Sequence, residues 1–126
     1  MIANGCKIIT LNHDYNFPAI QGKFHNYFFD KGHPGEINEP PNIERTRGDV
    51  IIGNDVWIGE DVFITSGIQI GNGCCIGAKS VVTKNLDSYS IYAGIPAKFI
   101  KKRYPQNVID FLEELKWWDW DDKKIR

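Results

Sequence analysis

The sequence predicts an all-β fold, a solenoid of short parallel strands with a long inserted loop and a C-terminal α-helix. The main observation is a repeat of six residues that runs from about residue 49 to residue 86. Its first position is always aliphatic: Ile52, Ile58, Ile64, Ile70, Ile76 and Val82. Its second position is Gly or Thr. Its fifth position is apolar or small: Val56, Val62, Ile68, Cys74, Ser80 and Leu86.

A period of six fits neither an α-helix nor the simple alternation of a strand. It fits a coil with three flat sides, each with an aliphatic residue toward the axis and a small residue near the corner. Each residue then stacks on the one 18 positions ahead, which predicts three pairs: Ile52 on Ile70, Ile58 on Ile76, and Ile64 on Val82. Ordinary strands joined by frequent glycine turns are the alternative, and they do not require aliphatic residues in register.

Before the repeat, residues 2–8 form another hexad, with Ile2 and Ile8 in its first position. The register then breaks and resumes near Val50. The segment between, residues 14–47, is rich in aromatic residues: Phe17, Phe24, Tyr27, Phe28 and Phe29. Long unpatterned segments in compact domains are usually functional loops or disorder, and this one is too aromatic for simple disorder. We expect a projecting, partly packed loop.

After the repeat, residues 93–97 predict a turn that leaves the coil. Pro105 or Asn107 is expected to open a helix with Asp110 in its first turn. Apolar residues then recur at helical spacing: Val108, Ile109, Leu112 and Leu115. Three tryptophans are expected to pack against the solenoid or a neighbouring chain: Trp117, Trp118 and Trp120. The predicted organisation is a β-helix domain over 1–104 and a helix with its tail over 105–126, packed on that domain.

The composition is that of one globular domain. The chain has 126 residues, of which 42% are apolar and 25% charged, which excludes a disordered tail, a collagen-like chain and a coiled coil. Its net charge of −1 argues against bulk nucleic-acid binding. No apolar run reaches about 18 residues, and no secretory signal pattern is visible, so neither a membrane span nor export is expected. Cys6, Cys74 and Cys75 form no disulfide framework, which favours a cytoplasmic protein.

Four segments together resemble the hexapeptide-repeat acyltransferases: the repeat itself, VWIG at 56–59, IGAKSVVTK at 76–84 and AGIPAKFIKKR at 93–103. The tail LKWWDW at 115–120 and the pair Asn12-His13 before the aromatic loop are similar to the xenobiotic acetyltransferase branch. That branch includes type B chloramphenicol and streptogramin acetyltransferases. Similar sequences also occur among capsular-polysaccharide and galactoside O-acetyltransferases. The match covers residues 1–13 and 49–120.

The resemblance implies a left-handed parallel β-helix, a hand that the periodicity alone does not show. It also implies a homotrimer. The chain itself also favours association. Its few coils form a thin core for a stable monomer, and its four tryptophans need a surface to pack against. Members of the family usually carry further coils before the part matched by residues 1–13. The chain is therefore expected to be either naturally short or a fragment.

Acyl transfer from a thioester to a hydroxyl needs a general base, and histidine suits that task near neutral pH. His13 lies where the hexad register breaks, and it matches the family's catalytic histidine. The resemblance therefore implies that His13 is the general base, and Asp14 could orient its imidazole. His25 and His33 lie in the loop without a motif and are interpreted as ordinary loop residues.

The resemblance implies contacts to the thioester end of acetyl-CoA. Glu60 matches a residue whose main-chain N–H faces the developing oxyanion, although its acidic side chain departs from the small residue often found there. Trp57 matches a tryptophan that flanks the acceptor or the thioester. The backbone of Ala78 matches a contact to the pantetheine arm, where small residues allow close approach. Transfer is expected to be direct, because Cys74 is predicted to lie in the core and Cys75 has no nearby base.

The nucleotide end of acetyl-CoA is implied to lie against the next matching residues. Thr83 and Lys84 follow Ala78 on the family pattern, and Lys98 and Lys101 fall on its phosphate-contacting positions. Lys98 and Lys101, together with Lys102 and Arg103, give four basic residues and no acidic residue within residues 98–103. The phosphates of acetyl-CoA require such cations.

The acceptor is less defined. Asp14 and Tyr15 are the nearest candidate contacts, and a sugar, a polysaccharide unit and a xenobiotic all stay open, as does N-acetylation.

No metal is required. The γ-type carbonic anhydrases share this architecture and bind zinc through three histidines, but none of the three here falls on a face of the repeat. A non-catalytic interaction module is the third interpretation, and it would need neither His13 nor the basic cluster.

Overall fold

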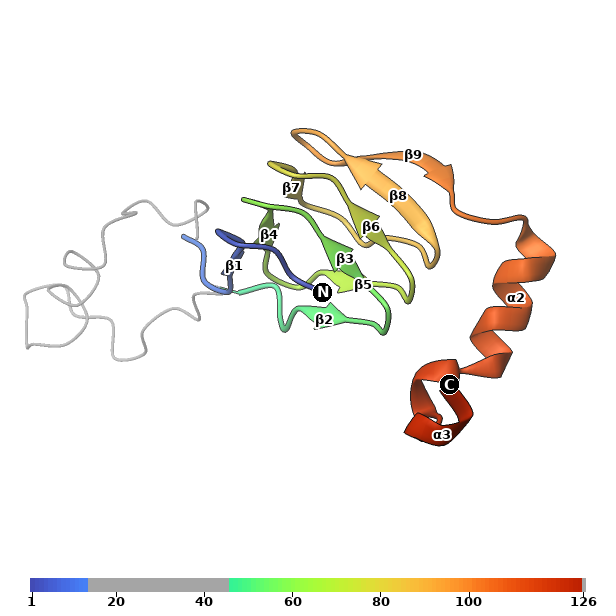
Figure 1. The fold of residues 1–126 in the computed structure, drawn as a ribbon. Coiled ribbons are helices and arrows are strands. Elements are labelled where there is room, and N and C mark those ends of the chain that lie inside the picture. Colours follow the sequence, from blue (N-terminus) through green and yellow to red (C-terminus); the bar gives the residue numbers. More distant parts are fainter. Residues whose placement is uncertain (14–45, 126) are drawn as a thin grey trace, which may run out of the picture.

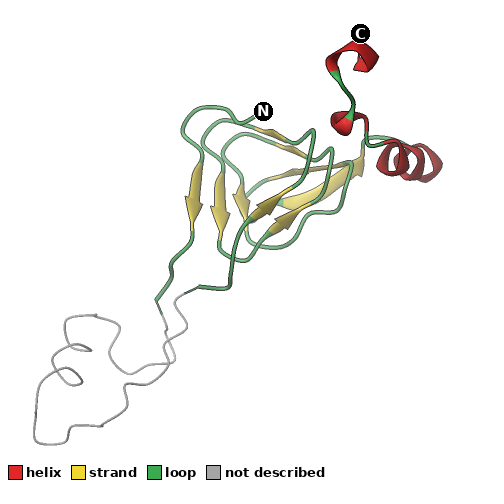
Figure 2. Cartoon of the chain, turned by 90° about the horizontal axis from the view of Figure 1, so that it is seen from below, coloured by secondary structure: helices red, strands yellow, loops and turns green. Residues whose placement is uncertain are grey.

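The chain folds into a three-sided prism of short strands, followed by helices at its C-terminal end (Figure 1). The computed structural model describes residues 1–13 and 46–125. The prism contains the following strands: β1 (Lys7–Ile9), β2 (Ile51–Ile52), β3 (Trp57–Ile58), β4 (Phe63–Thr65), β5 (Gln69–Ile70), β6 (Cys75–Ile76), β7 (Val81–Val82), β8 (Ser90–Ala93) and β9 (Lys98–Lys102). Figure 2 shows how successive coils outline its three sides.

Each side of the prism is one sheet. The first sheet has the order β1-β4-β7, the second β2-β5, and the third β3-β6-β8-β9. All pairs are parallel except β8 with β9. Isolated parallel bridges extend two sheets, since Ile2 pairs with Ile58 and Ile70 with Leu86. Each side therefore receives one short strand from each coil, as a β-helix requires.

The stacking pairs predicted from the repeat are all present. The strand register sets Ile52 opposite Ile70, Ile58 opposite Ile76, and Ile64 opposite Val82. The N-terminal hexad joins the same stacks, because Ile8 lies opposite Ile64. The period of six and the turn of 18 residues are thus confirmed.

The core consists of the first and fifth positions of the hexads. First-position side chains from Ile58 to Val82 are at most 2% exposed, and the fifth positions at most 5%. Cys74 is buried as predicted. Ser80 is a fifth position too, and its hydroxyl donates to the carbonyl of Gly77 (2.6 Å) and accepts from the N–H of Gly94 (3.0 Å). A small polar residue is tolerated there because both of its hydrogen bonds are made.

The repeat glycines permit the coils to stack closely. At Gly59, a Cβ atom would lie 2.6 Å from the backbone nitrogen of Ala78 in the next coil. Any side chain at this position would push the two coils apart and break the hydrogen bond from the N–H of Gly59 to the carbonyl of Ile76 (2.9 Å). Gly59 is therefore required for the packing of these two coils.

The parallel coiling ends at β9, which runs antiparallel to β8 after the turn at residues 94–97. This confirms the predicted turn out of the coil. Helix α2 (Gln106–Leu115), the 3-10 helix η1 (Trp117–Asp119) and helix α3 (Asp122–Ile125) follow beyond β9 (Figure 1). Because α2 begins at Gln106, Asp110 is not in its first turn, and that expectation is wrong. Asp110 instead accepts a hydrogen bond from the Gln106 side chain (2.7 Å).

The tryptophans of the tail lie partly buried and pack locally. The rings of Trp117 and Trp118 meet edge to face at 6.1 Å, and the Lys124 ammonium lies 4.1 Å from the centre of the Trp120 ring. Packing of these rings against a second copy stays a prediction. None of the helices in the described part of the chain is long and apolar enough to cross a membrane.

Candidate active site

His13 leaves the prism at one particular edge. Register pairs Ile9 with Thr65 and Ile64 with Val82, so the segments that follow β1, β4 and β7 stack on one another. We call these segments the His13 edge (residues 10–13, 66–67 and 83–85). The chain also returns there, since the N–H of Gly67 donates to the carbonyl of Gly48 (2.9 Å). Neighbouring strands lie about 4.8 Å apart, so the stacked segments span about 10 Å.

His13 itself is exposed on this edge. Its backbone N–H donates to the Oδ1 of Asn12 (3.2 Å). The predicted acceptor contacts Asp14 and Tyr15 lie outside the described residues, as do His25 and His33. The structure therefore gives the position of the imidazole on the fold and leaves the orienting role of Asp14 as a prediction.

A pocket lies at the other end of the His13 edge and unites three predicted residues. Thr83, Lys84 and Lys98 line a cavity of about 300 Å³, together with Asn85, Leu86, Tyr92, Pro96, Ala97 and Phe99. We call it the lysine pocket. Two exposed ammonium groups at its rim give it a positive field, and the aromatic rings of Tyr92 and Phe99 (5.7 Å apart, edge to face) provide an apolar wall. Such a pocket fits an anionic ligand that carries a flat apolar group.

The basic run after the turn divides into two pairs. Lys102 donates to the carbonyl of Ser88 (3.1 Å), and Arg103 donates to the carbonyl of Gly73 (2.7 Å). These two side chains hold β9 against the coils. Lys98 and Lys101 are exposed instead, and Lys101 lies on β9 outside the lysine pocket. The side chains of Lys98 and Lys101 make no hydrogen bond or ion pair within the described residues, and they are the pair that the resemblance implies for the phosphates.

The remaining predicted residues lie at a second edge, which follows β3 and β6. We call it the Glu60 edge (residues 59–61 and 77–79). Trp57 stands before it with 47% of its surface exposed. The carbonyl of Glu60 accepts from the N–H of Lys79 (2.7 Å). Within residues 1–13 and 46–125, the N–H groups of Glu60 and Ala78 make no hydrogen bond. Both are free to donate to a ligand.

The predicted site is therefore divided in a single chain. Thr83, Lys84 and Lys98 come together on the His13 edge, and Glu60 joins Ala78 on the other edge. The sheet of β1, β4 and β7 separates the two groups. Sequence order did not reveal this division, because it follows from which side of the prism each hexad occupies.

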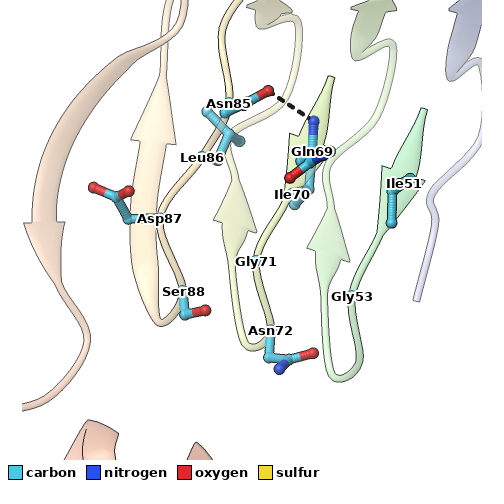
Figure 3. Close-up of a pocket in the computed structure, with 10 residues that line it drawn as sticks. All are labelled: Ile51, Gly53, Gln69, Ile70, Gly71, Asn72, Asn85, Leu86, Asp87 and Ser88. Atoms are coloured by element: carbon cyan, nitrogen blue, oxygen red, sulfur yellow. Dashed lines mark hydrogen bonds between the residues drawn. The ribbon is translucent and has the colours of Figure 1, made fainter. Parts of the chain in front are cut away.

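A second cavity was missed by the sequence analysis. We call it the amide groove; it measures about 460 Å³ and lies along the β2-β5 sheet (Figure 3). Its lining residues are Ile51, Gly53, Gln69, Ile70, Gly71, Asn72, Asn85, Leu86, Asp87 and Ser88. It shares Asn85 and Leu86 with the lysine pocket, so the two cavities adjoin. The only signal in the sequence is a series of polar residues at outward repeat positions, which is typical of any solvated face.

Comparison with known proteins places the fold in a family. Residues 49–84 match the family model described as bacterial transferase hexapeptide (six repeats). The chain is also 43% identical over 126 residues to a probable macrolide acetyltransferase from Lysinibacillus sphaericus, covering 98% of this chain and 68% of that protein. The chain belongs to the hexapeptide-repeat acetyltransferases. Its coils are accordingly those of a left-handed β-helix.

Two further relatives show the range of the family. A chloramphenicol acetyltransferase from Klebsiella aerogenes is 48% identical over 79 residues, which are 63% of this chain and 38% of that protein. A crystal structure of a variant of AntD, an N-acyltransferase from Bacillus cereus in complex with dTDP and coenzyme A, has a TM-score of 0.57 and 28% identity. The alignment covers 89% of this chain and 54% of that one. The chain thus spans between about two fifths and two thirds of the length of these relatives.

The described part of the chain contains no cluster of side chains that could bind zinc. Among residues 1–13 and 46–125, no three His, Cys, Asp or Glu side chains gather where they could hold a metal ion. The three cysteines are free, and burial raises the pKa of the Cys74 thiol. Cys74 is therefore a core residue that stays protonated.

Proposed function

We propose that this protein transfers the acetyl group of acetyl-CoA to a hydroxyl of a sugar, polysaccharide unit or xenobiotic. The observation that carries the proposal is the lysine pocket, which brings Thr83, Lys84 and Lys98 together on the edge from which His13 leaves. A nucleotide that carries phosphates fits its two cations and its aromatic wall. Membership of the acetyltransferase family and the coenzyme A bound by the AntD relative support the same donor.

In the proposed mechanism, His13 removes the proton of the acceptor hydroxyl as the oxygen attacks the thioester carbonyl. The tetrahedral intermediate carries its negative charge on the former carbonyl oxygen, and the unoccupied N–H of Glu60 supports a role as oxyanion donor. Collapse of the intermediate breaks the C–S bond. The proton held by the imidazolium then passes to the departing CoA sulfur. The acetyl group passes directly to the acceptor, so no cysteine is acylated.

The division of the site supports a homotrimer. His13, Lys84 and Lys98 occupy one edge of the prism, while Trp57, Glu60 and Ala78 occupy another. A cleft between two copies, one offering each edge, would bring both groups to one acetyl-CoA molecule. Lys101, on the outward strand β9, would then serve the phosphates from the rim. The free cysteines agree with a cytoplasmic protein.

A transfer assay tests this function. The purified chain is incubated with labelled acetyl-CoA and a panel of hydroxyl and amine acceptors, and the release of CoA thiol is followed. Release that depends on the acceptor, with label in the acceptor's hydroxyl ester, is expected. Failure to bind CoA would favour the interaction module. Stoichiometric zinc in elemental analysis, together with hydration of carbon dioxide, would favour the zinc enzyme.

A further inference from the structure

The amide groove offers hydrogen-bonding groups that the fold does not use. The side chain of Asn72 is already hydrogen-bonded within the fold, because it accepts from the N–H of Asn54 (2.7 Å) and donates to Glu113 (2.8 Å). The carbonyl oxygen of the Asn85 amide accepts from the backbone N–H of Gln69 (2.9 Å; Figure 3). The amide of Gln69 and the hydroxyl of Ser88 have no hydrogen-bond partner among the described residues. An amide and a hydroxyl together offer donors and acceptors to a ligand.

The charge of the groove restricts its ligand. The residues that line it include one carboxylate, that of Asp87, and no cation. Asp87 lies in the connection between β7 and β8, and its side chain extends away from Gln69 (Figure 3), so it stands at the rim. A phosphate or sulfate in the groove would be repelled by the Asp87 carboxylate, and the neighbouring Lys102 ammonium is already bonded to the carbonyl of Ser88. A neutral or amine-bearing ligand would not be repelled.

The place of the groove relates it to both parts of the predicted site. Its Asn85 end adjoins the lysine pocket. Its other end is at Ile51 on β2. The chain enters β2 just after Gly48, whose carbonyl accepts a hydrogen bond from Gly67 at the His13 edge. A ligand along the groove therefore lies beside the edge that runs from the imidazole to the two lysines. An acceptor bound there is next to the edge that carries His13.

We infer that the amide groove is the acceptor subsite for a hydroxyl-rich ring without negative charge, such as a neutral sugar or an amino sugar. The inference rests on the proposed function for the reaction, but the binding it describes does not need the donor. Gln69 and Ser88 bond to the ring hydroxyls, and the carbons of the ring lie against the exposed side chain of Ile51, which is paired with Gln69 in the sheet. Asp87 selects against anionic acceptors.

An NMR titration of the full chain with three probes tests the inference. Methyl α-D-glucoside and D-glucosamine should shift the backbone amide signals of Gln69, Asn85 and Ser88, and D-glucose 6-phosphate should bind more weakly. Gln69→Ala combined with Ser88→Ala should weaken binding of the first two probes about tenfold, because two hydrogen bonds are lost. Gln106→Ala, the same change on helix α2, should leave the affinity unchanged. Asp87→Asn, which keeps the shape of the side chain, should strengthen binding of D-glucose 6-phosphate.

The inference is overturned if neither sugar shifts these signals, if the shifts lie elsewhere, or if the double variant binds as tightly as the parent chain. Acetyl-CoA binding is measured on the same samples. If acetyl-CoA binds tightly but no sugar binds at Gln69, the groove is not the acceptor subsite and the proposed acetyl transfer still stands. Sugar at Gln69 without donor binding removes the transferase proposal and leaves the groove as a sugar site.

Discussion

Ile58 lies opposite Ile76 in the next coil, and both side chains are almost completely buried. Their separation of 18 residues is one turn of the prism, so each side chain rests on its counterpart. Ile76→Ala would leave a cavity in the middle of this stack. We expect a loss of about 3 kcal/mol in the free energy of unfolding, measured by urea denaturation. Ile51→Ala, at a half-exposed position, should cost less than about 0.5 kcal/mol. Equal losses would show that the aliphatic stacks do not form the core.

Among the described residues, a hydrogen bond from Asn72 to Glu113 joins helix α2 to the prism, and Ile109 is the residue of the helix that is buried. A helix of ten residues is marginal on its own, so its order depends on such contacts. Glu113→Ala should speed amide hydrogen exchange in α2 and leave exchange in the coils unchanged. Glu114→Ala, at the exposed neighbouring position, should leave both unchanged. Slow exchange in α2 of the first variant would mean that another contact holds the helix.

Tyr89 carries a buried hydroxyl that has no hydrogen-bond partner within the described ranges. Burial raises the pKa of Tyr89 above its ordinary value, and the nearby carboxylate of Glu113 adds to the shift. A raised pKa stabilises the fold below the ordinary value of about 10, and that stability is lost as pH rises toward the folded-state pKa. Tyr89→Phe should therefore flatten the fall of the melting temperature above about pH 10, with little change at neutral pH. Identical pH profiles for both chains would contradict this assignment.

The core of the fold could be predicted from the sequence because every coil of a β-helix repeats the same spacing of core residues. Every sixth residue must fill the axis, and Gly59 must admit the next coil, so register and burial followed from spacing alone. The bonds of Lys102 and Arg103 could not be predicted, since they form only after β9 reverses direction. Of the two predicted openings of α2, Pro105 is the N-cap that the structure shows, so Asp110 lies beyond the first turn.

The site was predictable only as separate groups. Lys84 and Lys98 were identified from the resemblance, and the turn at residues 94–97 brings them into one pocket. That Glu60 lies on a different edge depends on the three-sided winding, which a linear motif does not contain. The amide groove left no motif at all, because its polar groups come from two coils.

Lys98 is predicted to contribute to binding of the donor. Lys98→Ala should raise the KM for acetyl-CoA about tenfold with kcat unchanged, because a phosphate contact is made equally in the ground and transition states. Lys102→Ala is the matched change in the same basic run. Its ammonium group holds the carbonyl of Ser88, so this variant should lose stability and keep its KM. Steady-state kinetics and thermal melts separate the two outcomes, and equal KM values for Lys98→Ala and the parent would remove Lys98 from the donor site.

We propose that His13, at the edge of the left-handed β-helix, is the base for acetyl transfer. The most direct test measures acceptor-dependent release of CoA thiol by His13→Ala and, on the same protein, the Kd for CoA. We predict that turnover falls at least about 100-fold while the Kd for CoA stays within about twofold of the parent value. Turnover within a few-fold of the parent would show that His13 is not the base.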